Sequence, residues 1–283
     1  YDDGLAVKKF ASQYPLDLHL IDVNQQNVLD HWDEFISDVD FPVGDSAGYL
    51  TWRIGKEAKS RVKVLISGAG ADELWGGYRR HRAFDFYLRR KQLLLSVKGV
   101  GQGLPLSREW VKFFEGVSTD SNQTFLNFSG LRNVPEELFL QYQGLFNINL
   151  PEFKRALDFD RKVYLVQDVL KIQDQSLMSH SIEGRAPYLD AGMINLWRSV
   201  EDKRLLLDKK WIHESLVDLN LDWVSKRKKL GFGLPLQEWF TQGGPFADRA
   251  FESIGNFVLL FGDSLSPEMK RIAISPKKFA QSD

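Results

Sequence analysis

A run of small and acidic residues, Ser-Gly-Ala-Gly-Ala-Asp-Glu-Leu-Trp-Gly-Gly-Tyr at 67–78, combines the residue types that bind phosphate and metal ions. It directly follows Val-Lys-Val-Leu-Ile at 62–66, a β-branched run typical of a buried parallel strand. A small-residue loop lets backbone N–H groups approach an anion, and a helix that starts after it offers its positive end to the same anion. Asp72 and Glu73 fit there as metal ligands, helix caps or ligand contacts. The pattern predicts an anion site beyond a strand.

Two familiar phosphate loops do not fit this run. Gly68 and Gly70 match the Gly-x-Gly of the dinucleotide fingerprint, but Glu73 stands at the position of its third glycine. A Walker loop needs Gly-Lys-Ser/Thr, which does not occur in the sequence. The alternative is an ordinary strand-to-helix turn in which Asp72 caps the helix.

Composition narrows the function classes. The 283 residues carry a net charge of −1, which argues against the basic surface of a nucleic-acid-binding protein. The absence of cysteine excludes disulfides, thiolate catalysis and cysteine-ligated zinc, and the five histidines form no H-E-x-x-H motif. No apolar run approaches the roughly 20 residues of a membrane-spanning helix. We therefore expect a cytoplasmic protein that uses neither nucleic acid nor a membrane.

The order of expected elements is that of an α/β sheet. Apolar stripes predict helices within 6–14, 28–39, 49–58 (with Ser46 as cap) and 73–90, and strands at 16–20 and 62–66. Strand 62–66 should be central, parallel and buried on both faces, with the 67–73 loop at its carboxyl end. After residue 91 no strand pattern recurs. Short helices are expected in 107–157, two of them starting at Pro135 and Pro151, and a longer one over 161–182.

Three later segments carry polar residues that a core would not need. Glu183 and Arg185 stand just before Pro187, so we place them in a turn, either as a structural brace or as part of a site. The basic run at 226–229 ends in Gly-Phe-Gly-Leu-Pro at 231–235. It is either a solvated helix end or a loop that brings a lysine to phosphate charge. Lys209 and Lys210 are expected on the surface.

Together these segments resemble the synthetase domain of asparagine synthetases. The matching blocks, in chain order, are Ser-Gly-x-Gly-x-Asp-Glu-x-x-Gly-Gly-Tyr at 67–78, Asp-x-x-x-Met at 174–178, Glu-x-Arg-x-Pro-aromatic-Leu-Asp at 183–190 and Arg-x-Lys-x-Gly-Phe-x-x-Pro at 227–235. Four blocks in order are far more specific than any one of them, and the resemblance covers roughly residues 1–240. It implies an α/β fold, with a parallel sheet of the adenine-nucleotide alpha-hydrolase-like (PP-loop ATPase) type and a mostly helical C-terminal half.

The resemblance also implies an activity. ATP and a carboxylate, with aspartate as the first expectation, give an acyl-adenylate and pyrophosphate, and ammonia then attacks to form an amide. By motif match the AMP-binding loop is Ser67, Gly68, Ala69, Gly70 and Asp72, with Asp72 also binding Mg²⁺. Lys229 stabilises charge on the phosphates or the adenylate. Glu183 and Arg185 belong to the catalytic pocket and shape it.

The chain departs from the family pattern at Ala69, where asparagine synthetases often carry a glutamate. A relative that amidates or cyclises another carboxylate, or a non-catalytic homologue that binds nucleotide or a partner chain, therefore stays open. A hydrolase or deaminase is disfavoured, because neither a Ser-His-Asp arrangement nor a metal-ligand cluster is readable.

The family's Ser-Gly-Gly-x-Asp-Ser loop and its N-terminal cysteine nucleophile do not occur in the sequence. We therefore expect residues 1–283 to be a synthetase domain without its first βα unit. Residues 1–90 would be its α/β nucleotide-binding part and residues 91–283 its mainly helical part. The expected partners are an upstream glutaminase domain or chain, the small substrates ATP, a carboxylate and ammonia, and a second copy in a possible homodimer.

Overall fold

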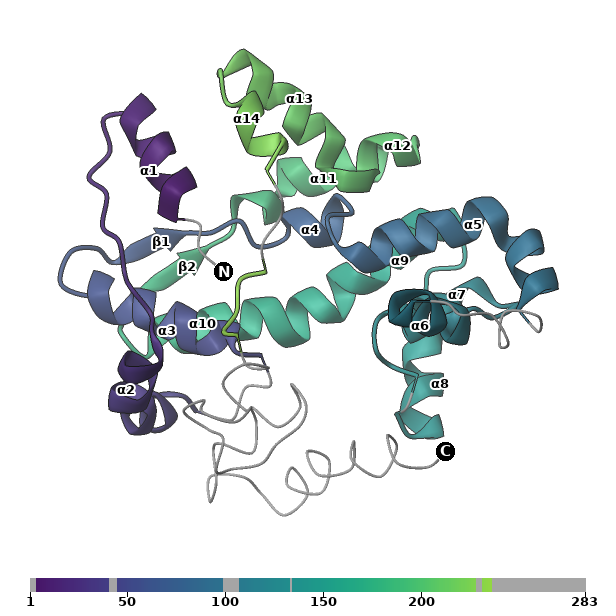
Figure 1. Cartoon of the computed structure of the whole chain (residues 1–283), viewed down its shortest axis with the longest axis horizontal. Coiled ribbons are helices and arrows are strands. Elements are labelled where there is room, and N and C mark those ends of the chain that lie inside the picture. Colours follow the sequence, from purple (N-terminus) through teal and green to yellow (C-terminus); the bar gives the residue numbers. More distant parts are fainter. Residues whose placement is uncertain (1–3, 41–44, 99–106, 133, 228–230, 236–283) are drawn as a thin grey trace. The chain divides into compact units, whose positions relative to one another are not determined.

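The computed structural model describes residues 4–40, 45–98, 107–132, 134–227 and 231–235. The chain divides into two compact units, each built from separate stretches of sequence (Figure 1). The first contains residues 1–67, 168–185 and 226–283, and the second contains residues 68–167 and 186–225. The boundary between the units falls inside the glycine-rich motif, between Ser67 and Gly68.

The first unit contains a parallel pair of short strands, β1 (Val64–Ile66) and β2 (Glu183–Arg185). Their register pairs Val64 with Glu183, Leu65 with Gly184 and Ile66 with Arg185. The predicted parallel strand is confirmed, and it ends where the glycine-rich motif begins. Strand β2 was not predicted, because Glu-Gly-Arg has none of the β-branched residues that mark a strand.

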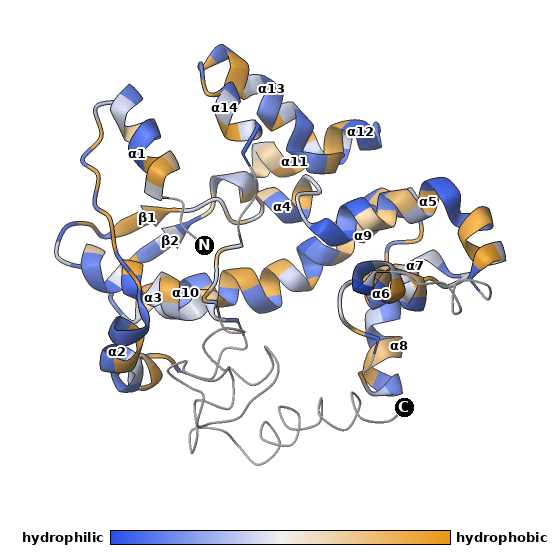
Figure 2. Ribbon diagram, in the orientation of Figure 1, coloured by the Kyte–Doolittle hydropathy of each residue, from blue (hydrophilic) through white to orange (hydrophobic). Residues whose placement is uncertain are grey.

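The expected burial of β1 on both faces is wrong for the described residues. Side chains alternate between the two faces of a strand, and the face with Val64 and Ile66 is open to solvent, with Ile66 76% exposed. Figure 2 shows β1 as an apolar segment. The reason is the size of the sheet, since the described residues form two strands only and so give β1 a single neighbour.

The strand expected at 16–20 is also absent from the structure. Residues 16–24 have no regular secondary structure, and Leu16, Leu18 and Leu20 are all exposed. An alternating pattern is necessary for a half-buried strand but does not supply the neighbouring strand whose backbone completes the ladder. No strand of the described chain lies beside this segment to pair with it.

Helices supply the core of the first unit, which contains α1 (Gly4–Gln13), α2 (Gln25–Asp38), α3 (Ala47–Ala58) and α10 (Leu170–Met178). Helix α2 starts at Asn24, whose side chain accepts the N–H of Asn27 in a capping box. Phe35 of α2 lies with its ring centroid 5.4 Å from Tyr49 and 5.7 Å from Trp52 of α3, and all three are fully buried. Burying three large aromatic rings is the main stabilising term here.

The cap of α3 differs from the prediction. Ser46 precedes the helix but makes no side-chain cap bond. The Oδ1 of Asp45 accepts the N–H of Ala47 at 2.9 Å instead. The hydroxyl oxygen of Ser46 instead accepts a hydrogen bond from the N–H of Leu234.

The regular secondary structure described in the second unit consists of helices and helical turns. Its helices and helical turns are α4 (Ala71–Leu74), α5 (Arg79–Val97), α6 (Arg108–Gly116), α7 (Ser121–Phe128), α8 (Glu136–Gly144), α9 (Glu152–Lys162), η3 (Pro187–Leu189), α11 (Ala191–Ser199), α12 (Lys203–Leu206), η4 (Leu207–Lys209), α13 (Lys210–Asp218) and α14 (Asp222–Ser225). Their core is rich in aromatic residues, including Trp75, Phe84, Phe125 and Phe159. Pro135 and Pro151 precede α8 and α9, as predicted.

Two predicted helices are interrupted. The helix expected over 73–90 splits into α4 and α5, because Gly76 adopts φ +65° between them. The helix expected over 161–182 divides into the end of α9, a π-helical turn η2 (Leu165–Val169) and α10. None of the described helices combines the length and the apolar character needed to cross a bilayer.

We predict that Gly76→Ala lowers the free energy of unfolding by about 1–3 kcal/mol, because alanine is strained at positive φ. Its Cβ would also lie 2.6 Å from the carbonyl oxygen of Leu206. The control is Gly144→Ala at the end of α8, where a Cβ meets nothing within 4 Å, and which should not destabilise. Urea unfolding of the two variants measures the difference. Equal effects would contradict the assigned role of Gly76.

Candidate functional site

Ser67 is the first residue of the glycine-rich motif and continues β1. Its N–H donates to the carbonyl oxygen of Arg185 at 2.8 Å, which extends the parallel ladder by one step. Its hydroxyl donates to Oε1 of Gln173 at 2.5 Å. Gln173 comes from α10 and is 9% exposed. Both contacts lie inside the first unit.

The loop from Gly68 to Gly70 opens the second unit. Gly70 has φ +89°, and a Cβ there would lie 2.4 Å from Cδ2 of Leu189, so the position accepts only glycine. Gly68 is exposed, and a Cβ there would meet nothing within 4 Å. Packing within the described protein therefore explains Gly70 but not Gly68.

Helix α4 contributes less to anion binding than the sequence suggested. It has only four residues, so few peptide dipoles add along its axis. The N–H of Ala71, at the start of this helix, donates to the carbonyl oxygen of Gly68 at 3.2 Å.

Asp72 is fixed by two contacts. Its Oδ1 lies 2.8 Å from Nζ of Lys209, and the two side chains are 23% and 24% exposed. The carboxylate also covers the backbone of Gly77, where a Cβ would lie 1.7 Å from the same oxygen. The second glycine of the Gly-Gly pair thus leaves the space of a side chain to the Asp72 carboxylate.

Lys209 reaches Asp72 from a turn with unusual backbone geometry. Asp208 and Lys209 both adopt positive φ, at 60° and 55°, which costs a non-glycine residue about 1–3 kcal/mol each. Backbone bonds hold the turn in place, since the N–H groups of Asp208 and Lys209 donate to the carbonyl oxygens of Gly76 and Trp75 at 3.1 and 2.8 Å. The surface position expected for Lys209 is wrong, because nothing in a Lys-Lys pair reveals this turn.

Glu73, next to Asp72, is buried rather than turned toward solvent. It accepts a hydrogen bond from the Tyr78 hydroxyl. Burial raises the pKa of Glu73, and the charges of Asp72 and Asp160 add to the shift. Burial likewise raises the pKa of Tyr78, together with the negative charge of Glu73. The Glu73–Tyr78 bond closes the loop around the two glycines.

A buried ion-pair cluster anchors the segment that follows. Nε and NH2 of Arg80 donate to Asp160 at 2.9 and 2.7 Å, and Nε2 of His81 lies 2.7 Å from the same carboxylate. The Arg80 guanidinium also lies 4.2 Å from the ring centroid of Tyr78 and 4.5 Å from that of Tyr164. Several contacts to one buried carboxylate fix the start of α5 and with it the end of the motif.

Glu183 and Arg185 form β2 and pair with each other, with Arg185 Nε donating to Glu183 Oε1 at 3.0 Å. Both side chains are more than half exposed, and the guanidinium lowers the pKa of the Glu183 carboxyl. The register of the two strands places them opposite Val64 and Ile66. They belong to a strand, not to the turn that was expected.

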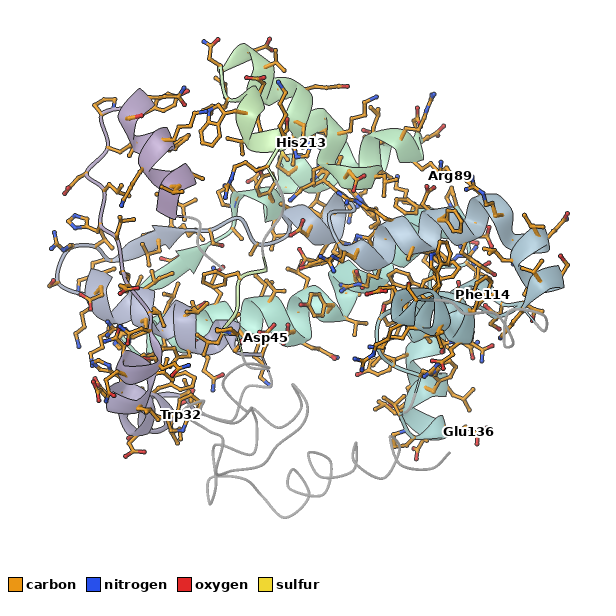
Figure 3. The ribbon with its side chains drawn as sticks, in the orientation of Figure 1. Trp32, Asp45, Arg89, Phe114, Glu136 and His213 are labelled. Carbon is orange, nitrogen blue, oxygen red and sulfur yellow. The ribbon has the colours of Figure 1, made fainter. Side chains whose placement is uncertain are left out.

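Lys229 lies outside the described residues, but the end of its motif is described. Leu234 is buried, and its N–H donates to Oγ of Ser46 at 2.9 Å. The Gly-Phe-Gly-Leu-Pro segment therefore contacts the start of α3. The neighbouring Asp45 is labelled in Figure 3, and burial raises the pKa of its carboxyl. Nothing in the sequence pattern predicted Ser46 as the acceptor of this hydrogen bond.

The motif residues agree in order and type with a known family. The model of the asparagine synthase family matches residues 1–256. The chain belongs to this family. It is 25% identical over 243 residues to asparagine synthetase [glutamine-hydrolyzing] 1 of Bacillus subtilis, which covers 77% of this chain and 38% of that protein.

Other curated relatives are similarly distant. A putative asparagine synthetase [glutamine-hydrolyzing] of Mycobacterium tuberculosis is 26% identical over 79% of this chain and 37% of its own length. Asparagine synthetase [glutamine-hydrolyzing] 3 of B. subtilis is 24% identical over 86% of this chain and 38% of its own length. The chain thus spans less than half the length of these relatives. No solved structure gives a significant match.

We predict that Lys209→Met lowers the free energy of unfolding by about 1–2 kcal/mol, because it leaves the partly buried Asp72 carboxylate without its cation. The control is Lys210→Met, whose ammonium is mostly exposed and 3.7 Å from Glu214, and which should cost less than about 0.5 kcal/mol. Urea unfolding measures both, and Asp72→Asn should recover part of the loss in Lys209→Met. Similar losses from the two lysine variants would show that the ion pair contributes nothing.

We predict that Glu73 makes the protein less stable as pH rises. Its pKa is raised in the folded state, so the folded protein holds this proton more tightly than the unfolded chain. The free energy of unfolding therefore falls as pH increases above about 4.5. Glu73→Gln, which keeps an acceptor for Tyr78, should remove this slope between pH 4.5 and 8.

The control for this prediction is Glu183→Gln. The pKa of Glu183 is lowered, so any stabilisation that it gives is present above its unfolded pKa and lost as pH falls. The two variants should therefore change the pH profile of urea unfolding in opposite directions. A profile left unchanged by Glu73→Gln would contradict the raised pKa of Glu73.

Proposed function

We propose that this chain is the synthetase part of an ATP-dependent amide-forming ligase. In this reaction a carboxylate oxygen attacks the α-phosphorus of ATP, the bond to the β-phosphate breaks, and pyrophosphate leaves. Ammonia then attacks the acyl carbon, and AMP leaves with its bonding electron pair. The observation that carries the proposal is Asp72, held by Lys209 and Gly77 inside the Ser-Gly-x-Gly-x-Asp-Glu-x-x-Gly-Gly-Tyr motif of an asparagine synthase family chain.

The loop residues are assigned to the nucleotide. Ser67 and Gly68 contact the AMP moiety, and Ala69 and Gly70 continue the loop beside it. Gly68 supports this role, because its missing side chain is not needed for packing and would matter only for something that approaches from outside. The sheet of the adenine-nucleotide alpha-hydrolase type that the family implies would continue from β1 and β2.

Asp72 is assigned to Mg²⁺. Magnesium in nucleotide sites is typically held by one or two carboxylates, with water and phosphate oxygens completing the octahedron. The described residues contain no group of three acidic or histidine ligands, so Asp72 fits as a single protein ligand and not as part of a closed metal cage. When bound, the ion would neutralise charge on the phosphates. Lys209 would have to leave Asp72 or share it.

The remaining roles follow the motif match. Lys229 supplies positive charge to the phosphates or the adenylate. The contact of Leu234 with Ser46 supports it, because it fixes the chain five residues later. Glu183 and Arg185 shape the pocket beside Ser67, and their mutual ion pair leaves neither charge uncompensated.

Aspartate is the first choice of carboxylate. Ala69 favours a second candidate, a relative that acts on another carboxylate, because a methyl group replaces the glutamate that asparagine synthetases often carry. We assign ammonia as the nucleophile, released from glutamine by a glutaminase domain or chain. The names of the matched relatives describe those proteins as glutamine-hydrolysing.

The test is carboxylate-dependent exchange of labelled pyrophosphate into ATP by the full-length protein. Exchange with aspartate, followed by asparagine formation when ammonia is added, supports the first candidate. Exchange with another carboxylate from a panel of amino and dicarboxylic acids supports the second. The absence of exchange with every carboxylate, in a protein that binds Mg-ATP, would make it a non-catalytic homologue.

Lys229→Ala should reduce the exchange rate by about 10²–10³, the usual loss when one preorganised charge is removed from a transition state. The matched control is Lys228→Ala, its neighbour in the same basic run, which should change the rate less than about threefold. The readout is kcat at saturating ATP. Equal losses for the two lysines would reduce the run to a general basic patch.

A further inference from the structure

Gln173 is a buried amide next to the nucleotide loop that no sequence motif identified. It projects from α10, and its Oε1 accepts the hydroxyl proton of Ser67. The bond joins residues 106 positions apart in the sequence. A buried glutamine is costly unless its amide is bonded, and the Ser67 hydroxyl supplies a partner for Oε1 of Gln173.

Gly184 makes room for that glutamine. A Cβ at Gly184 would lie 2.4 Å from Nε2, 2.8 Å from Cγ and 2.9 Å from Cδ of Gln173. The amide side chain therefore lies flat on the backbone of β2. Since Leu65 is paired with Gly184, Gln173 reaches across the sheet from β2 to the end of β1. Gln173 and Gly184 are a matched pair.

We propose that Gln173 is a positioning residue that fixes the polarity of Ser67. A serine hydroxyl has one proton to donate and two lone pairs that accept. With the proton committed to Gln173, Ser67 can offer a ligand only an acceptor. This inference rests on the proposed nucleotide site. As an acceptor, the Ser67 hydroxyl would recognise a hydrogen-bond donor of the nucleotide. This donor is a ribose hydroxyl or the adenine amino group, and not a phosphate oxygen.

The first test measures nucleotide affinity of the full-length protein by calorimetry. The probes are ATP and three analogues that each lack one donor, namely 2′-deoxy-ATP, 3′-deoxy-ATP and purine riboside triphosphate. We expect the wild type to bind one analogue about 5–10-fold more weakly than ATP, the loss typical of one hydrogen bond. Ser67→Ala should abolish this discrimination, and Gln173→Leu should reduce it to less than about twofold.

Gly184→Ala provides an independent perturbation. Its methyl group would push the Gln173 amide away without removing any polar atom, so it should reduce the discrimination as Gln173→Leu does. The matched control is Gln175→Leu, which removes another buried glutamine of α10 and should leave the discrimination unchanged. Loss of discrimination in Gln175→Leu as well would reduce the effect to general damage to α10 and overturn the proposal.

A second measurement needs no nucleotide. If the Ser67–Gln173 bond exists, the melting temperature losses of Ser67→Ala and Gln173→Leu should not add in the double variant, because either change breaks the same bond. Additive losses would overturn the role of Gln173 whatever the protein binds. Non-additive losses without binding of any nucleotide would instead overturn the proposed function, and with it the donor assigned to Ser67. Equal affinity of the wild type for ATP and all three analogues would overturn the polarity claim alone.

Discussion

The carboxylate of Asp72 lies where a side chain of Gly77 would otherwise be, and the glycine-rich motif and the turn at 208–209 meet at this carboxylate. A partly buried negative charge must be compensated by a cation or by hydrogen bonds. Here the cation is Lys209, which is 137 residues later in the sequence (209 − 72). To bring it there, the chain after α12 bends through two residues at positive φ and bonds to the backbone of Trp75 and Gly76. The two glycines of the Gly-Gly pair, Gly76 and Gly77, therefore have separate functions. Gly76 accommodates the turn, and Gly77 accommodates the carboxylate.

The first unit has its own organising contact in the parallel pairing of β1 with β2. The two strands come from distant parts of the sequence, and the ladder continues to the N–H of Ser67. The same sheet brings the Glu183–Arg185 pair beside the strand that leads into the loop. The Ser46–Leu234 bond fixes the fourth block, 227–235, against the start of α3 in the same unit. The first unit therefore contains the block at 174–178, the start of the block at 183–190 and the block at 227–235.

The sequence predicted the features that depend on local pattern. Strand 62–66 and the starts of α8 and α9 after proline were found because β-branched runs and prolines act on their own backbone. The four motif blocks were recognised because residue type, spacing and order can be read from the sequence alone. Features that depend on a distant partner were not found. Residues 16–20 alternate like a strand but pair with no strand of the described chain, and β2 is a strand only because β1 pairs with it.

The site residues that were missed share the same cause. Lys209 looks like any surface lysine until the backbone angles of its turn are known. Gln173 differs from an exposed glutamine only in its burial beside Ser67 and Gly184. The cap at Asp45 in place of Ser46 reflects a partner 188 residues away that engages the serine hydroxyl. In each case, sequence spacing carries no information about the contact.

The turn at 208–209 places stability and chemistry in opposition. Glycine would adopt its backbone angles without strain, so the backbone conformation by itself favours glycine at both positions. At residue 209, however, glycine would remove the ammonium group that compensates Asp72. A variant without a charge at residue 72 would be free to relax this turn with a glycine at 209. Lysine at this strained position is thus explained by the charge of Asp72, which it compensates, and not by the backbone.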